Sequence, residues 1–136
     1  MQKTVKIMSV ITICSLFFAG CFSSGYSTSK LVKEIKNSEH FKKEVVEYSE
    51  TVAVMFYTVA CVTCREIKPL IGELGEKWQN KIKIVTVNCR TNTDLVMEYE
   101  IHAVPRFIFF KNGEKLTEPL SVKDEDALFA LFEEHS

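Results

Sequence analysis

Several features that mark specialised proteins are missing from this chain of 136 residues. Lysine and arginine (17) nearly balance aspartate and glutamate (18), and no basic stripe suggests contact with nucleic acid. No internal repeat is present. Beyond the first 20 residues, no apolar run approaches the roughly 20 residues that a membrane-spanning helix needs. These absences favour one ordinary folded domain that neither spans a membrane nor binds nucleic acid.

The first residues have the parts of a secretory signal. Two lysines and no acid stand in the first six residues, and an almost unbroken apolar run follows at 7–19. The end of this run, FAGC at 18–21, resembles the bacterial lipobox, with phenylalanine in place of the usual leucine. We therefore expect residues 1–20 to be a lipoprotein signal peptide and Cys21 to carry lipid. An ordinary signal peptide or an uncleaved anchor is the alternative.

A short linker and one domain follow the expected signal. Residues 22–30, FSSGYSTSK, offer nothing to a core, so residues 21–30 are expected to be the lipidated cysteine and a flexible tether. Residues 31–136 suffice for one domain. We expect this domain to be extracytoplasmic, held on a bacterial membrane in the periplasm or at the cell surface. Disulfides can persist in such a compartment.

Hydrophobic periodicity predicts alternating strands and helices in the domain. The run TVAVMFYT at 51–58 is apolar throughout, as in a central strand covered on both faces. After Cys61, apolar residues recur at helical spacing as far as Trp78, with Pro69 inside the predicted helix. The order of elements predicts an α/β fold with a mixed sheet and helices on both faces. The other expected strands are 31–35, 81–88, 107–110 and 115–120, and the other expected helices are 37–48, 93–99 and 124–134.

A set of short motifs in this order resembles the thioredoxin family. The motifs are a Cys-x-x-Cys pair that opens a helix, an apolar strand before it, a proline five residues after it, an X-Pro pair before a strand, and a closing hairpin: Cys61 and Cys64, Phe56-Tyr57, Pro69, Val104-Pro105 and FFKNGEK. The resemblance implies a thioredoxin fold with a mixed central sheet of four to five strands and helices on both faces. The segment CVTCRE is also similar to the C-terminal domain of the bacterial transmembrane thiol–disulfide interchange reductase.

The position of the two cysteines suits thiol–disulfide exchange. A cysteine in the first turn of a helix lies beside free backbone N–H groups and the positive end of the helix dipole, which stabilise a thiolate. Cys61 has this position, and Cys64 lies on the same helix face within reach of a disulfide. We expect Cys61 to attack a substrate disulfide and Cys64 to resolve the mixed disulfide. Val62 and Thr63, between them, are expected to set the redox potential.

The resemblance also implies a substrate-binding surface. In the family, the proline that corresponds to Pro105 is cis and lies against the cysteine pair; a cis bond before proline costs only about 0.5–1 kcal/mol. The backbone of Val104 would then offer its N–H and C=O to an extended substrate. Ala60 belongs to this surface, at a position where the family usually has tryptophan. The alternative is that Pro105 simply begins a strand.

Besides Ala60, three positions depart from the family pattern. Met55 stands where the family often has a buried acid that is thought to help deprotonate the second cysteine. Thr86 stands where the lysine partner of that acid is common, and Arg106 follows Pro105 in place of threonine. Because the acid–lysine pair is absent, we expect Cys64 to resolve mixed disulfides slowly.

Other roles for the cysteines remain open. A purely structural disulfide between Cys61 and Cys64 would close a loop too small to stabilise the fold much. A zinc site from Cys61, Cys64, Cys89 and His102 is conceivable, but there is no second Cys-x-x-Cys motif, and we expect neither a metal nor another cofactor. Cys89 ends an apolar strand and is expected to be a free, poorly reactive thiol. The rival interpretation of Cys89 is a regulatory or dimer-forming thiol.

The sequence therefore predicts a membrane-tethered, extracytoplasmic thiol–disulfide oxidoreductase that reduces protein disulfides through Cys61 and Cys64. Its expected partners are disulfide-containing proteins, the membrane that holds the lipid of Cys21, and a thiol electron donor for which a transmembrane reductase is one candidate. No nucleic-acid partner is expected. Two alternatives stay open: the same chemistry run as oxidant or isomerase, and a thioredoxin-fold binding module without catalysis.

Overall fold

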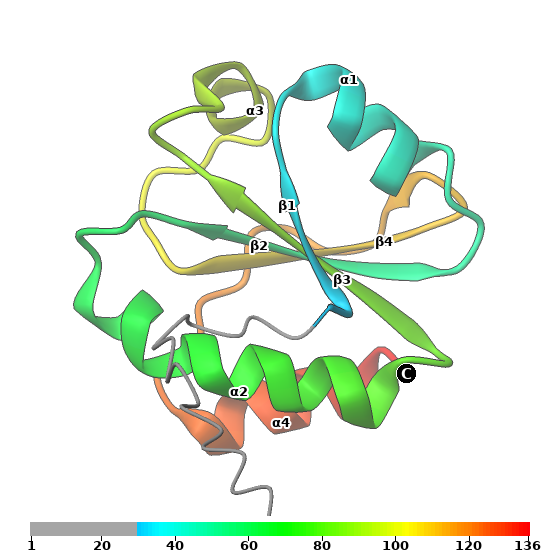
Figure 1. Cartoon of the computed structure of the whole chain (residues 1–136), viewed down its shortest axis with the longest axis vertical. Helices are drawn as coiled ribbons and strands as arrows, with labels where there is room; N and C mark the ends of the chain where they lie inside the picture. Colours follow the sequence, from blue (N-terminus) through cyan, green and yellow to red (C-terminus); the bar gives the residue numbers. More distant parts are fainter. Residues whose placement is uncertain (1–29) are drawn as a thin grey trace, which may run out of the picture.

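A mixed five-stranded sheet forms the centre of the computed structural model, which describes residues 30–136 (Figure 1). The spatial order of the strands is β1-β3-β2-β4-β5. β1, β3 and β2 run parallel, β4 is antiparallel to β2, and β5 is antiparallel to β4. The expected signal peptide, Cys21 and the tether up to residue 29 lie outside the described residues. The strands are β1 (Val32–Ile35), β2 (Thr51–Tyr57), β3 (Ile82–Asn88), β4 (Arg106–Lys111) and β5 (Glu114–Lys115).

Helices cover both faces of this sheet, as predicted. Figure 1 shows α2 and α4 on one side, here called the α2 face, and α1 and α3 on the other, the α1 face. The π-helix η1 continues α1 without a break. Among residues 30–136, no helix is both long enough and apolar enough to cross a bilayer. The helices are α1 (Ser38–Phe41), η1 (Lys42–Val46), α2 (Val62–Trp78), α3 (Thr93–Glu98) and α4 (Glu125–Glu134).

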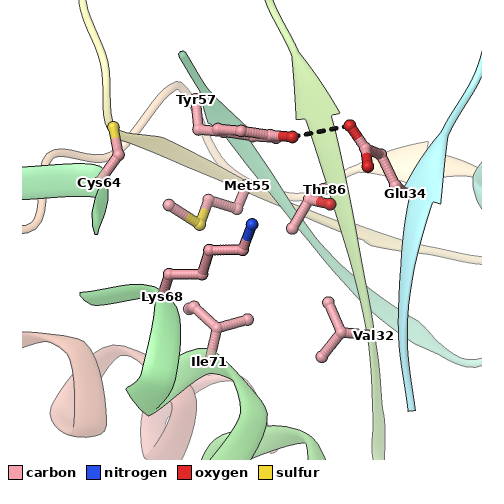
Figure 2. A pocket seen from close by; sticks show the side chains of 8 residues that line it. All are labelled: Val32, Glu34, Met55, Tyr57, Cys64, Lys68, Ile71 and Thr86. Carbon is pink, nitrogen blue, oxygen red and sulfur yellow. Dashed lines mark hydrogen bonds between the residues drawn. The ribbon is translucent and has the colours of Figure 1, made fainter. Parts of the chain in front are cut away.

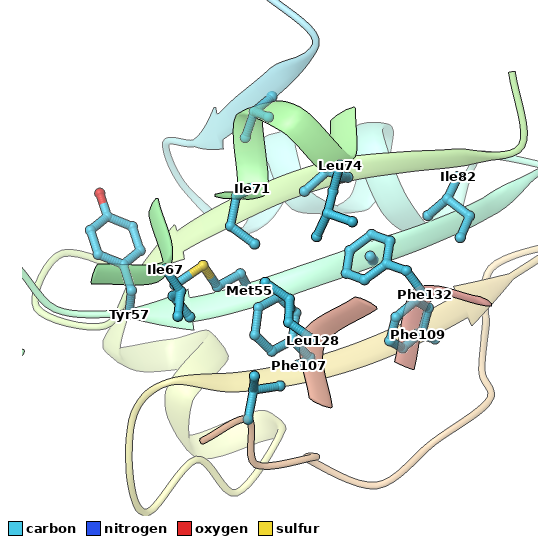
Figure 3. Close-up of a cluster of buried hydrophobic side chains, with 14 of the residues drawn as sticks. Met55, Tyr57, Ile67, Ile71, Leu74, Ile82, Phe107, Phe109, Leu128 and Phe132 are labelled. Atoms are coloured by element: carbon cyan, nitrogen blue, oxygen red, sulfur yellow. The ribbon is translucent and has the colours of Figure 1, made fainter. Parts of the chain in front are cut away.

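The core consists of two layers separated by the sheet. Every residue of β2 is buried, which confirms a central strand covered on both sides. Successive side chains of a strand point to opposite faces. Accordingly, Met55 and Tyr57 pack with α2 and α4, whereas Val54 and Phe56 pack under α1 and α3. Figure 3 shows the α2-face layer, in which Phe107 and Phe109 of β4 meet the helix side chains.

Side-chain caps fix the start of the helices. Asn37 Oδ1 accepts a hydrogen bond from the backbone N–H of His40 at 2.8 Å, which starts α1. Asp124 Oδ1 accepts from the N–H of Ala127 at 2.9 Å and starts α4. Each bond satisfies one of the backbone donors that the first turn of a helix leaves free. The helix α2 begins differently, because its N-cap is Cys61.

The closing hairpin is shorter than its sequence suggests. A strand was expected over 115–120, but β5 covers only Glu114–Lys115. The hydroxyl of Thr117 accepts the hydrogen bond of the Phe109 N–H at 3.1 Å, in place of a ladder carbonyl. Pro119 then has no N–H to give to the ladder. Pairing with β4 resumes only as one isolated bridge.

Candidate active site

Cys61 and Cys64 are joined by a disulfide where α2 begins, a few residues beyond the end of β2. The backbone of Cys61 is extended (φ −76°, ψ 115°), and its Sγ accepts a hydrogen bond from the N–H of Cys64 at 3.1 Å. The sulfur therefore takes the place that a serine or aspartate oxygen usually has at an N-cap. Free N–H groups and the helix dipole at this end favour negative charge on Cys61.

The two sulfurs differ in their access to solvent. Cys61 is half-buried, and its neighbours Ala60 and Val62 are exposed, Val62 to 57%. Cys64 is only 2% exposed and belongs to the core layer of the α2 face. Thr63 is intermediate between them. An incoming disulfide can therefore reach Cys61, while Cys64 is accessible chiefly to Cys61 itself.

The Val104–Pro105 peptide bond is cis, and the loop that contains it lies against the cysteine pair. The carbonyl oxygen of Val104 is 3.8 Å from Cys61 Sγ. Pro105 is buried, and Arg106 Nη1 donates a hydrogen bond to the Pro105 carbonyl at 3.1 Å. The guanidinium of Arg106 is thus held at the backbone of this loop.

Apolar residues surround the disulfide on its solvent side. Val59 is 61% exposed, and the exposed Ala60 and Val62 continue the same surface. Thr58, Val59 and Arg65 line a shallow hollow next to Cys64. The surface beside Cys61 is therefore apolar at Val59, Ala60 and Val62, and Arg65 and Lys68 add positive charge in the adjoining hollow.

A cavity of about 120 Å³ lies between α2 and the sheet, behind Cys64 (Figure 2). We call it the Cys64 cavity. Met55 and Thr86 are paired in register across β2 and β3 and both line it. Met55 and Thr86, which stand where the family often has an acid and its lysine partner, therefore lie side by side near Cys64. The lining consists of Val32, Glu34, Met55, Tyr57, Cys64, Lys68, Ile71 and Thr86.

Three polar residues of this cavity were not predicted from the sequence as residues of the site. The hydroxyl of Tyr57 donates to Glu34 Oε1 at 2.7 Å, and burial together with this bond raises the pKa of Tyr57. The third is Lys68. Helical spacing could have found Lys68, because it follows Cys64 by four residues. Glu34 could not be found in this way, since its place depends on β1 pairing with β3.

Cys89 lies on the opposite face of the sheet from Cys64. Its side chain packs against the α1-face layer, and its N–H donates to the carbonyl of Tyr57 at 2.9 Å. Cys89 is free, and burial raises the pKa of its thiol. Within residues 30–136, no three His, Cys, Asp or Glu side chains gather where they could hold a metal ion. The Cys₃His arrangement that the sequence left open is therefore not formed, because the sheet separates its sulfurs.

Comparisons with known proteins agree with this geometry. The family model described as Thioredoxin matches residues 32–134. The chain is 35% identical over 105 residues to Thioredoxin H5 of Oryza sativa subsp. japonica, which covers 77% of this chain and 76% of that protein. It is 33% identical over 88 residues to the thioredoxin of Rickettsia conorii, which covers 65% of this chain and 84% of the relative.

A solved structure gives the same result. The Malassezia sympodialis thioredoxin Mala s 13 superposes on this chain with a TM-score of 0.70 and 27% sequence identity. The match covers 76% of this chain and 90% of the solved chain. The similarity thus extends over nearly all of the fold that carries the disulfide.

Proposed function

Because the chain belongs to the thioredoxin family and is a thiol–disulfide oxidoreductase with a Cys-x-x-Cys pair, we propose that it reduces protein disulfides outside the cytoplasm, held on a bacterial membrane by a lipid on Cys21. Family members act on disulfide substrates and take electrons from thiol donors. The location is supported by one observation, the small residues and cysteine of FAGC (18–21) at the end of an apolar run.

In the reducing direction, the thiolate of Cys61 attacks one sulfur of the substrate disulfide, and the other substrate sulfur leaves. Cys64 then attacks Cys61, which forms the Cys61–Cys64 disulfide and releases the second substrate thiol. Two electrons pass from the cysteine pair to the substrate, and a thiol donor later returns them. The half-buried position of Cys61 between exposed neighbours and the buried position of Cys64 support this order of attack.

The direction of the strands supports a tether before the domain. β1 is parallel to β2, and the far end of β2 leads into the loop that carries Cys61. The chain therefore enters the sheet on the side away from the disulfide. An anchor upstream of β1 would therefore join the domain on the side opposite the cysteine pair.

Mass spectrometry of the mature N-terminus tests the anchor. We expect a lipid-modified Cys21 and a protein that fractionates with membranes, whereas Cys21→Ser is released or left unprocessed. A free amine at any other residue would reject the lipidation.

The reduction potential of the Cys61–Cys64 couple tests the direction of electron flow. A value near that of thioredoxin, about −270 mV, supports a reductant, and a value near −120 mV supports the oxidant alternative. Insulin reduction by wild type, Cys61→Ser and Cys64→Ser separates an enzyme from a binding module. A module would show no difference between the three.

A further inference from the structure

Lys68 lies on the same side of α2 as Cys64, one helical turn further along. Both side chains line the Cys64 cavity. Figure 2 shows the amine of Lys68 directed into this cavity beside Met55 and Thr86. The amine is 5.7 Å from the ring centroid of Tyr57, and among residues 30–136 it forms no ion pair. A half-buried cation without a carboxylate partner therefore shares a cavity with the buried cysteine.

We propose that Lys68 stabilises the thiolate of Cys64 when the mixed disulfide is resolved. It would thus compensate, from a different element, for the acid that position 55 lacks. A positive charge near a thiol favours the ionised form, which is the nucleophile. This inference rests on exchange by Cys61 and Cys64 and is independent of the membrane tether.

The step involves no proton transfer to Lys68. With a substrate bound through Cys61, the thiol of Cys64 gives its proton to water, for which a cavity of about 120 Å³ has room. The thiolate attacks Cys61 Sγ, the Cys61–Cys64 bond forms, and the bond from Cys61 to the substrate breaks. The substrate sulfur leaves with the electron pair and takes a proton from solvent. The charge of Lys68 lowers the free energy of the thiolate throughout.

The other ionisable groups that face Cys64 fit this role less well. Glu34 of β1 lies across the cavity from Cys64 in Figure 2, is exposed, and already accepts the Tyr57 hydroxyl. Its negative charge opposes a thiolate, and a solvated carboxylate is a weak base for a thiol. Tyr57 stays neutral, since burial raises its pKa. Arg65 lines the outer hollow and is exposed, so that solvent screens its charge.

Single-turnover decay of the mixed disulfide, followed across pH by stopped flow, tests the proposal. Lys68→Met keeps an unbranched apolar stem and removes the charge. We expect its decay at pH 7 to be about three- to tenfold slower, with the midpoint of the pH profile raised by roughly half to one unit. Lys68→Arg should restore the wild-type profile. The first step, attack by Cys61, should change little in either variant.

Arg65→Met is the matched control, because it removes one positive charge next to Cys64 without changing the cavity. We expect its profile to move clearly less than that of Lys68→Met. Three results would overturn the proposal: wild-type decay in Lys68→Met, equal shifts in the two methionine variants, or no rescue by a folded Lys68→Arg. A larger loss in Glu34→Gln than in Lys68→Met would also overturn it, and would assign the role to a carboxylate base.

Discussion

Cys64 and Cys89 lie on opposite faces of the same sheet, in surroundings that differ in three respects. Cys64 is in the first turn of a helix, next to a disulfide partner and beside a cavity that contains a cation. Cys89 follows β3, packs against the α1-face layer and has no sulfur partner within residues 30–136. Cys64 is nevertheless the less exposed of the two. Solvent exposure alone therefore does not determine which thiol takes part in exchange.

The difference shows what a resolving cysteine needs. Its target is always Cys61, which the helix holds within bonding distance, so access to solvent brings no advantage. Because both sulfurs belong to the same chain, Cys64 does not have to meet Cys61 by diffusion. Reactions between well-oriented groups in one molecule can be several orders of magnitude faster than between separate molecules. The Cys64 cavity also has room for a water molecule that can accept the proton of the Cys64 thiol, and it contains the positive charge of Lys68. Within residues 30–136, Cys89 has no sulfur partner held within bonding distance, which predicts that it does not take part in exchange.

Removing Cys64 should have the largest effect. Cys64→Ser is expected to accumulate mixed disulfides at Cys61 with natural partners, and to lower turnover by roughly a hundredfold or more, because the intramolecular attack is lost. Cys89→Ser, the matched variant on the other face, should turn over normally. Non-reducing gels and mass spectrometry measure the trapped species. Accumulation in Cys61→Ser instead of Cys64→Ser would reverse the two roles.

An acid on the floor of the cavity should have the next largest effect. Met55 is 2% exposed and paired with Thr86, so Met55→Asp places a carboxylate inside the Cys64 cavity. We expect mixed-disulfide decay at neutral pH to become several-fold faster, and the free energy of unfolding to fall by about 1–3 kcal/mol. Lys68 lines the same cavity, so we expect its positive charge to limit this loss of stability.

Met55→Leu is the control for this variant, because it keeps the volume and adds no charge. Stopped-flow decay and urea unfolding of the three proteins give the two quantities. Equal decay in wild type and Met55→Asp would show that no base was missing at this site.

Local patterns in the sequence were enough for most of the fold, but not for the complete cavity. The all-apolar run of β2 and the helical stripe after Cys61 predicted a central strand and a long helix, because burial on both faces leaves a recognisable pattern. Thr117 could not be foreseen as the residue that ends the hairpin ladder, since that depends on a side-chain bond. Glu34 reaches the site only because β1 joins the sheet beside β3, and sheet order is not a local property of the sequence.

The α1 face also contains a partly buried charged side chain, Glu44, but this carboxylate is paired with lysines. The carboxylate of Glu44 forms ion pairs with Lys83 at 2.6 Å and with Lys33 at 3.0 Å. The bond from Lys83 is the main cause that lowers the pKa of Glu44 to about 2, against the opposing effect of burial. Lys68 in the Cys64 cavity has no such carboxylate partner among the residues that the structure describes. We therefore expect the two charges to have different roles. The ion-paired Glu44 on the α1 face should stabilise the fold, and the unpaired Lys68 on the α2 face should stabilise a thiolate.

Glu44→Gln should destabilise the protein by roughly 1–3 kcal/mol at pH 7. Because the pKa of Glu44 is lower in the folded than in the unfolded state, its contribution is present above about pH 4.5 and is lost as pH falls towards 2. Urea unfolding of wild type and variant should therefore differ at pH 7 and converge near pH 2. Glu47→Gln, an exposed neighbour 3.9 Å from Lys42, should change stability little. A constant difference at all pH values would contradict the pairing.

Changes at Cys89 should have the smallest effect on exchange and on stability. In the reduced protein we expect iodoacetamide to label Cys61 at least about tenfold faster than Cys89 at pH 7. Burial raises the pKa of the Cys89 thiol, so that it holds little thiolate, whereas Cys61 lies at the positive end of the α2 dipole. Labelling of Cys89 should keep rising as pH increases beyond the ordinary thiol range. Cys89→Ala should leave exchange kinetics unchanged and lower the free energy of unfolding by about 1 kcal/mol or less, since only one small group is lost from the α1-face layer. Peptide-resolved mass spectrometry separates the two sites. Labelling of Cys89 as fast as Cys61 would instead favour a regulatory thiol, and the contrast between the two faces of the sheet would then fail.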